Sequence, residues 1–207
     1  MSSALRVARL VTAVAIAVAV GYELWRFVDR GLHVENFFSY FTILSNLAAI
    51  GVLAWTAAHP PASQSSRAAA VRGAVTLYMS ITGVVYAVLL APADVGKPEP
   101  WVDAVIHVLG PLVVFLDWVL EPSRRLAGRK LILAWLAFPL AYLVYSLIRG
   151  AVVDWYPYPF LDPDESGGYA GVSGFSIGIL ATFVAVALAL HWWARRPRAG
   201  TAVAYQP

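Results

Sequence analysis

The chain has no cysteine and few charged side chains. Its 207 residues are 13% charged and 60% hydrophobic, and the mean hydropathy is +0.68. Without cysteine there is no disulfide framework, no thiolate zinc site and no cysteine nucleophile. Soluble domains carry about 25% charged residues, and disordered chains and coiled coils are also rich in charged residues. The composition therefore excludes these classes, together with nucleic-acid-binding domains, and predicts an integral membrane protein.

Six apolar runs are long enough to cross a bilayer, which takes about 20 residues of helix. The connections between them are short and are polar or rich in proline and glycine, so consecutive helices should be antiparallel neighbours. The sequence predicts an all-α bundle of six transmembrane helices over residues 5–27, 37–58, 71–91, 102–120, 131–148 and 172–193. These helices form one domain, 1–194, and we expect the tail, 195–207, to be disordered.

Lysine and arginine gather on one side of this predicted bundle. With the N-terminus inside, the outer connections hold Arg26, Arg30, Lys97 and Arg149, and the other eleven of the fifteen basic residues lie inside. The positive-inside rule then predicts that both termini are cytoplasmic. Because topology accounts for the net charge of +3, we expect the lipid bilayer, and no nucleic acid, as the partner. A cleaved signal peptide is the alternative for the first run, but the run exceeds the usual ~7–15 apolar residues.

Uncharged polar and ionisable side chains within two of the spans are candidate functional residues, because such groups are costly in hydrocarbon. The second span carries Thr42, Ser45 and Asn46, and Thr42 and Asn46 share a helix face. The fourth span carries Asp103 and His107, one helical turn apart. At this spacing the carboxylate would reach the imidazole and fix its tautomer. A charge in the first helical turn is the structural alternative for Asp103.

Other charged groups in the spans have simple structural interpretations. Glu23 and Arg26 are three residues apart near the outer end of the first span, and we expect them to form an ion pair. Asp117 lies near the inner end of the fourth span, where we expect it at the interface, opposite the basic cluster at 124–130.

Thr42 and His107 are expected at matched depths. Thr42 follows Phe37 by five residues and His107 follows Val102 by five, at the starts of two spans that both run inward. At about 1.5 Å per residue, both lie roughly 7–8 Å below the outer ends of their helices. A hydroxyl and an imidazole at one depth on close helices would be a nucleophile with its base. The alternative is structural, since threonine in spans commonly bonds to its own backbone.

The longest connection, 149–171, is rich in aromatic residues and proline. It predicts a stiff lid over the outer end of the bundle, formed by Trp155, Tyr158, Pro159 and Phe160. An aromatic belt at the membrane interface is the alternative. The acidic residues that follow lack the spacing of a calcium loop, so we expect no metal and no cofactor.

Three motifs in this order resemble the androgen-induced transmembrane hydrolase family, and are most similar to its bacterial six-helix relatives. They are Phe41-Thr42 opening the second span, His107 with Pro111 in the fourth, and Trp155 with the Tyr-Pro-Phe-Leu run at 158–161. The resemblance covers nearly the whole chain in the number of spans, their order and the loop lengths. It implies a multi-pass protein of a bacterial inner membrane.

The resemblance also implies a threonine hydrolase that cleaves fatty-acid esters of hydroxy fatty acids. Thr42 would be the nucleophile and His107 the essential histidine, and a lipid ester or fatty-acyl group would be the ligand. We expect Asn46 or Ser45 to donate to the oxyanion. Asp103 departs from the family, in which an amide is expected here. The alternative function is a non-enzymatic bundle, such as a transporter, lipid-binding or partner protein, in which these polar residues only join helices.

Overall fold

The computed structural model describes residues 2–91, 98–123, 126, 128 and 130–196. In these ranges the chain is all-α, with six helices long and apolar enough to cross a membrane. The protein is thus a multi-pass membrane protein, as the composition predicts. The spans are α1 (Ser3–Asp29), α3 (Phe41–Ala58), α4 (Ser66–Val85, extended by a π-helical turn, Tyr86–Leu90), α5 to α6 (Pro100–Leu120), α7 (Lys130–Val153) and α9 (Gly168–Arg195). The predicted tail lies, from 197 on, outside the described residues.

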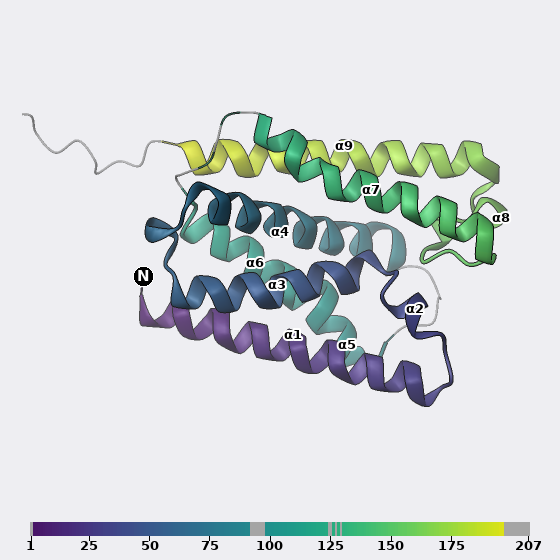
Figure 1. The fold of residues 1–207 in the computed structure, drawn as a ribbon, viewed down its shortest axis with the longest axis horizontal. Helices are drawn as coiled ribbons and strands as arrows, with labels where there is room; N and C mark the ends of the chain where they lie inside the picture. Colours follow the sequence, from purple (N-terminus) through teal and green to yellow (C-terminus); the bar gives the residue numbers. More distant parts are fainter. Residues whose placement is uncertain (1, 92–97, 124–125, 127, 129, 197–207) are drawn as a thin grey trace, which may run out of the picture.

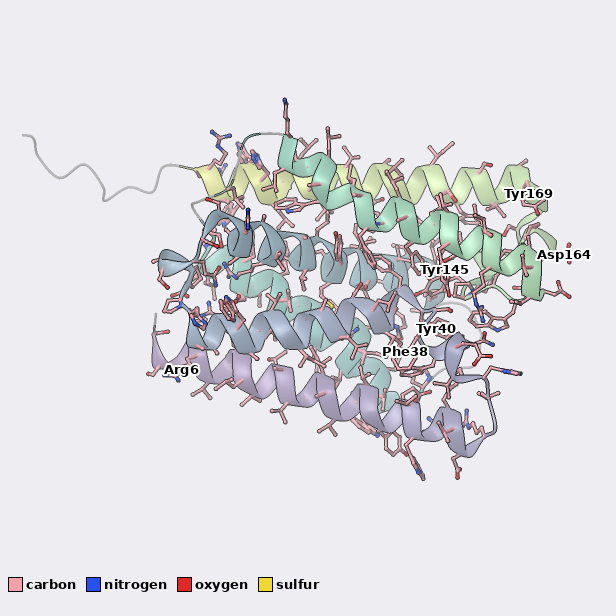
Figure 2. All side chains as sticks on the ribbon, in the orientation of Figure 1. Arg6, Phe38, Tyr40, Tyr145, Asp164 and Tyr169 are labelled. Carbon is pink, nitrogen blue, oxygen red and sulfur yellow. The ribbon has the colours of Figure 1, made fainter. Side chains whose placement is uncertain are left out.

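The spans form a bundle in which most consecutive spans pack together, as expected, but α6 packs on α4 and α1 and not along α7, so the expectation of neighbouring consecutive helices was wrong for this pair. α1 packs along α3, α3 along α4, and α7 and α9 lie together on the far side of α4 (Figure 1). The first residues of α1 and the last turns of α9 are at the same end. Figure 2 places Arg6 at that end and Tyr40, Tyr145 and Asp164 at the opposite end. Here the short helices α2 (Val34–Phe37) and α8 (Pro163–Ser166) connect the spans.

The second span begins later than the sequence predicts. Residue 37 ends α2, and α3 starts only at Phe41. The N-cap residue of α3, Tyr40, makes no side-chain capping hydrogen bond. Instead, the Tyr142 hydroxyl on α7 accepts a hydrogen bond from the Phe41 amide at 3.2 Å and donates one to the Ser39 carbonyl at 2.8 Å. These bonds satisfy backbone groups that the break exposes. The predicted start was wrong because hydroxyls from a distant helix, absent from the local pattern, stabilise the break.

A buried ionic cluster joins α1, α4 and α6 near the end that holds the termini. Asp117 is 7% exposed; its Oδ1 accepts from Arg9 Nε and its Oδ2 from Arg72 Nη2, both at 2.7 Å. The expectation of an interfacial Asp117 was therefore wrong, because the side chain is buried among partners from two other spans. Arg124, Arg125 and Arg129, in the cluster expected opposite it, lie outside the described residues. Arg9 and Arg72, which the topology prediction counts on the cytoplasmic side, are thus buried within the bundle and connect three spans through Asp117.

Candidate functional site

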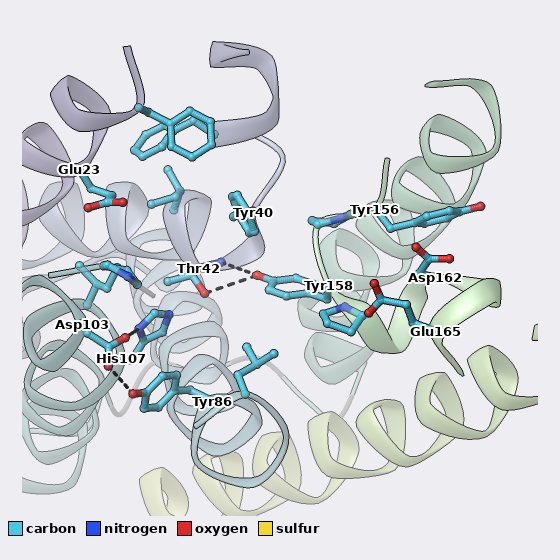
Figure 3. A pocket seen from close by; sticks show the side chains of 18 residues that line it. Glu23, Tyr40, Thr42, Tyr86, Asp103, His107, Tyr156, Tyr158, Asp162 and Glu165 are labelled. Carbon is cyan, nitrogen blue, oxygen red and sulfur yellow. Dashed lines mark hydrogen bonds and ion pairs between the residues drawn. The ribbon is translucent and has the colours of Figure 1, made fainter. Parts of the chain in front are cut away.

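A cavity of about 350 Å³ lies at the end of the bundle opposite the termini. Its walls come from the end of α1, the start of α3, the π-helical end of α4, the α5 to α6 span and the segment 156–165 (Figure 3). Thr42 and His107, the two residues singled out from the sequence, both line it. The bundle therefore brings them to one cavity from different spans.

His107 sits in a π-helical turn, Val105–Leu109, within its span. Pro111, four residues on, has no amide hydrogen to bond the His107 carbonyl, and its ring crowds that carbonyl. α4 packs closely against Pro111 at Gly83, where a Cβ would lie 3.2 Å from the Pro111 Cβ. The wider turn follows from the proline, and π-turns are frequent at functional sites.

The imidazole of His107 is held on one side by Asp103. Nδ1 of His107 lies 2.8 Å from Asp103 Oδ1, and the other carboxylate oxygen accepts a hydrogen bond from the Tyr86 hydroxyl. The Tyr86 ring stacks on the imidazole with centroids 4.3 Å apart and an interplanar angle of 7°. A carboxylate at Nδ1 favours the tautomer with the proton there, which makes Nε2 the basic nitrogen.

Thr42 lies in the first turn of α3 and is 7% exposed. Its amide donates to the Tyr158 hydroxyl at 3.2 Å, and its own hydroxyl is 3.4 Å from the same oxygen (Figure 3). Because α3 begins at residue 41, Thr42 is nearer to its helix end than the sequence predicts. No hydrogen bond joins Thr42 to His107 in the part of the chain that the structure describes, although both line the cavity.

The two residues expected to donate to an oxyanion have other positions. Both amide hydrogens of Asn46 are used, by the Thr42 carbonyl at 2.9 Å and the Ile106 carbonyl at 3.1 Å. Neither Asn46 nor Ser45 lines the cavity, and both are buried. Asn46 instead ties the turn that carries Thr42 to the π-turn that carries His107. The geometry gives it a positioning role and offers no oxyanion donor at either residue.

The segment expected to form a lid divides into parts with different contacts. Tyr158 and Pro159 line the cavity, together with the preceding Tyr156 and Pro157. Phe160 lines a second, apolar cavity, and Trp155 packs edge-on against Tyr40 with ring centroids 5.6 Å apart. Tyr158 therefore lines the cavity and contacts Thr42, whereas Trp155 packs against Tyr40, which lines the cavity.

Carboxylates and tyrosines give the cavity its polar character. Four acidic residues line it: Glu23, Asp103, Asp162 and Glu165. No lysine or arginine lines it among the described residues. Glu23 also pairs with Arg26 at 3.5 Å, as expected. Burial raises the pKa of the Tyr40 phenol to about 12 and raises that of Tyr158, so both stay neutral hydroxyls, and the Tyr158 hydroxyl accepts from the Thr42 amide. No group of three His, Asp or Glu side chains suited to a metal occurs in the described ranges.

Tyr86 and Tyr142 are parts of the site that sequence reasoning missed. Tyr86 orients Asp103, and Tyr142 caps the helix that presents Thr42. A tyrosine in an apolar span is usually interpreted as a packing residue, so nothing in the local sequence indicates a role in the site at either position. Glu23 was assigned only to an ion pair, and it also forms cavity wall.

Comparisons with protein-family models, with curated proteins and with solved structures found no match for this chain. The similarity of its motifs to the androgen-induced hydrolases thus stays a prediction.

Proposed function

We propose that this protein is an intramembrane hydrolase of lipid esters, with Thr42 as nucleophile and His107 as general base, near the outer face of a bacterial inner membrane. One observation carries the proposal. An imidazole whose Nδ1 is bound to a carboxylate lines the same cavity as a threonine hydroxyl. A nucleophile, a base and a group that orients the base are the parts that acyl transfer requires.

The reaction proceeds in two halves. His107 Nε2 takes the hydroxyl proton while Thr42 Oγ1 bonds to the ester carbonyl carbon. The bond to the alcohol oxygen then breaks, and the alcohol leaves with the proton from His107. In the second half a water gives a proton to His107 and its oxygen to the acyl carbon. The bond to Thr42 then breaks, Thr42 regains the proton, and the acid leaves.

One feature of the site supports this scheme. The Tyr158 hydroxyl beside Thr42 supplies a donor for the charge that develops on the carbonyl oxygen, and loss of one such donor costs on the order of a hundredfold in rate. The absence of a Thr42–His107 hydrogen bond is compatible with the reaction, since catalytic pairs in empty sites are often long and tighten with substrate.

The experiment is covalent labelling of the full chain in membranes with a fluorophosphonate probe. We expect the wild type to be labelled, Thr42→Ala to be unlabelled, and His107→Gln to lose at least about a hundredfold in labelling rate. Thr56→Ala and His59→Gln are matched controls, because Thr56 is a buried threonine near the other end of α3 and His59 follows that helix. Both controls should label as the wild type does. Labelling that survives in Thr42→Ala would refute the mechanism.

A non-enzymatic bundle is the second candidate, and two hydrogen bonds favour it. The Thr42 hydroxyl pairs with Tyr158, and Asn46 joins two spans, as helix-connecting groups do. In that case the wild type would show neither labelling nor ester turnover, and Thr42→Ala would change stability alone.

A further inference from the structure

A second cavity, of about 90 Å³, adjoins the first. Thr42 and Tyr158 line both, so they form part of the wall that the cavities share. The second cavity lies between α3, α4, α7, α9 and the turn at Pro159–Leu161, and its lining contains no charged residue. Leu140, 43% exposed on the outside of α7, also lines it, so the cavity reaches the lipid-facing surface.

Two hydroxyls in this apolar lining have no hydrogen-bond partner among the described residues. Thr82 on α4 is 5% exposed and its Oγ1 is unpaired; Ser176 on α9 has a buried Oγ that is also unpaired. The other three hydroxyls of the lining, on Thr42, Tyr142 and Tyr158, are all bonded. Burying a hydroxyl without a partner is unfavourable, so these two side chains call for a partner from outside the chain.

The helices themselves do not impose this arrangement. Serine and threonine in a helix commonly donate to the carbonyl four residues earlier. Four neighbours on the same two helices do so, at 2.7–2.9 Å: Thr76, Ser80, Ser173 and Thr182. Thr82 and Ser176 lack this bond and line the cavity instead. Buried hydroxyls without a partner among the described residues also occur at Ser45 and Ser146, but neither lines either of these two cavities.

The volume restricts what fits. About 90 Å³ corresponds to about three waters, or to three or four methylene groups. We infer that this cavity binds an acyl group carrying a hydroxyl or keto oxygen within about four carbons of its carbonyl, with Thr82 and Ser176 bonding that oxygen. The inference rests on the proposed function, in that the carbonyl meets Thr42 at the shared wall. The rest of a longer chain leaves beside Leu140 into the bilayer.

The test separates binding from catalysis. Radiolabelled β-hydroxymyristate and myristate are bound to the full chain in nanodiscs, and also to Thr42→Ala, which retains both orphan hydroxyls. We expect the hydroxylated acid to bind about fivefold more tightly in both proteins, as one net hydrogen bond predicts. Thr82→Val with Ser176→Ala should bring the two acids to parity. Thr82→Ser should keep the preference, which guards against a packing effect of the valine.

Thr76→Val with Ser173→Ala is the matched control on the same helices and should bind as the wild type does. Equal binding of the two acids by the wild type would overturn the inference, and it is the result expected if only water fills the cavity. A preference unchanged in the Thr82 and Ser176 double variant would also overturn it. If the preference holds while no probe labels Thr42, the binding site stands and the proposed hydrolysis falls.

Discussion

Replacing Asp117 by asparagine should destabilise the protein more than any other single loss of a carboxylate. Each Asp117 oxygen lies 2.7 Å from a guanidinium, and both partners, Arg9 and Arg72, are at most 2% exposed. Asparagine keeps the shape and removes the charge, so two buried cations would lose the carboxylate between them, while Glu121 stays paired with Arg9.

The magnitude follows from the contacts. A pair of unit charges about 4 Å apart gains about 4 kcal/mol at an effective dielectric constant of about 20, and breaking a buried pair typically costs 3–5 kcal/mol. Glu121 still holds Arg9 at 2.8 Å, and Arg72 keeps a bond to the Glu121 carbonyl at 2.7 Å. We therefore expect the lower end of that range, a loss of about 3 kcal/mol in the free energy of unfolding.

The assay is unfolding of the purified chain in mixed micelles by titration with a denaturing detergent. Tryptophan fluorescence is a suitable signal because Trp118, under the Arg72 guanidinium at 5.2 Å, is fully buried. Glu35→Gln is the control, since Glu35 is 65% exposed and its loss should change stability by no more than about 0.5 kcal/mol. A loss below about 1 kcal/mol for Asp117→Asn would refute the reasoning.

Two further predictions concern the site and its support. Tyr86→Phe keeps the ring that stacks on His107 and removes the hydroxyl that donates to Asp103, so we expect about tenfold slower probe labelling with unchanged stability; an unchanged rate would mean that the hydroxyl does not orient the carboxylate. Gly73→Ala should destabilise the bundle by about 1–3 kcal/mol in the same unfolding assay, because its Cβ would lie 2.3 Å from the Trp135 ring; wild-type stability would show that the ring moves aside at little cost.

The parts of the site that are close in sequence were predictable. Asp103 and His107 are four residues apart on one helix, and the expected contact is present at 2.8 Å. Tyr86 was not predictable, because it reaches the same carboxylate from another span. The expected matched depth of Thr42 and His107 was counted from residue 37, four residues before the start of α3 at Phe41, and their common cavity was not predicted. The two still line one cavity, and Asn46 bonds to the backbone of both turns.

Apolar length and the placement of basic residues specify the six spans, since hydrocarbon admits only helices that satisfy their own backbone. The sequence also marks which polar side chains must find partners inside the bundle. Which partners they find depends on helix packing: Asp117 meets arginines 108 and 45 residues away, and Thr42 meets a tyrosine 116 residues away. Buried polar groups bond whatever donor or acceptor the packed helices bring within about 3 Å. The tertiary structure alone therefore decides the start of α3, the tyrosine beside the threonine, and which two hydroxyls of the second cavity have no partner among the described residues.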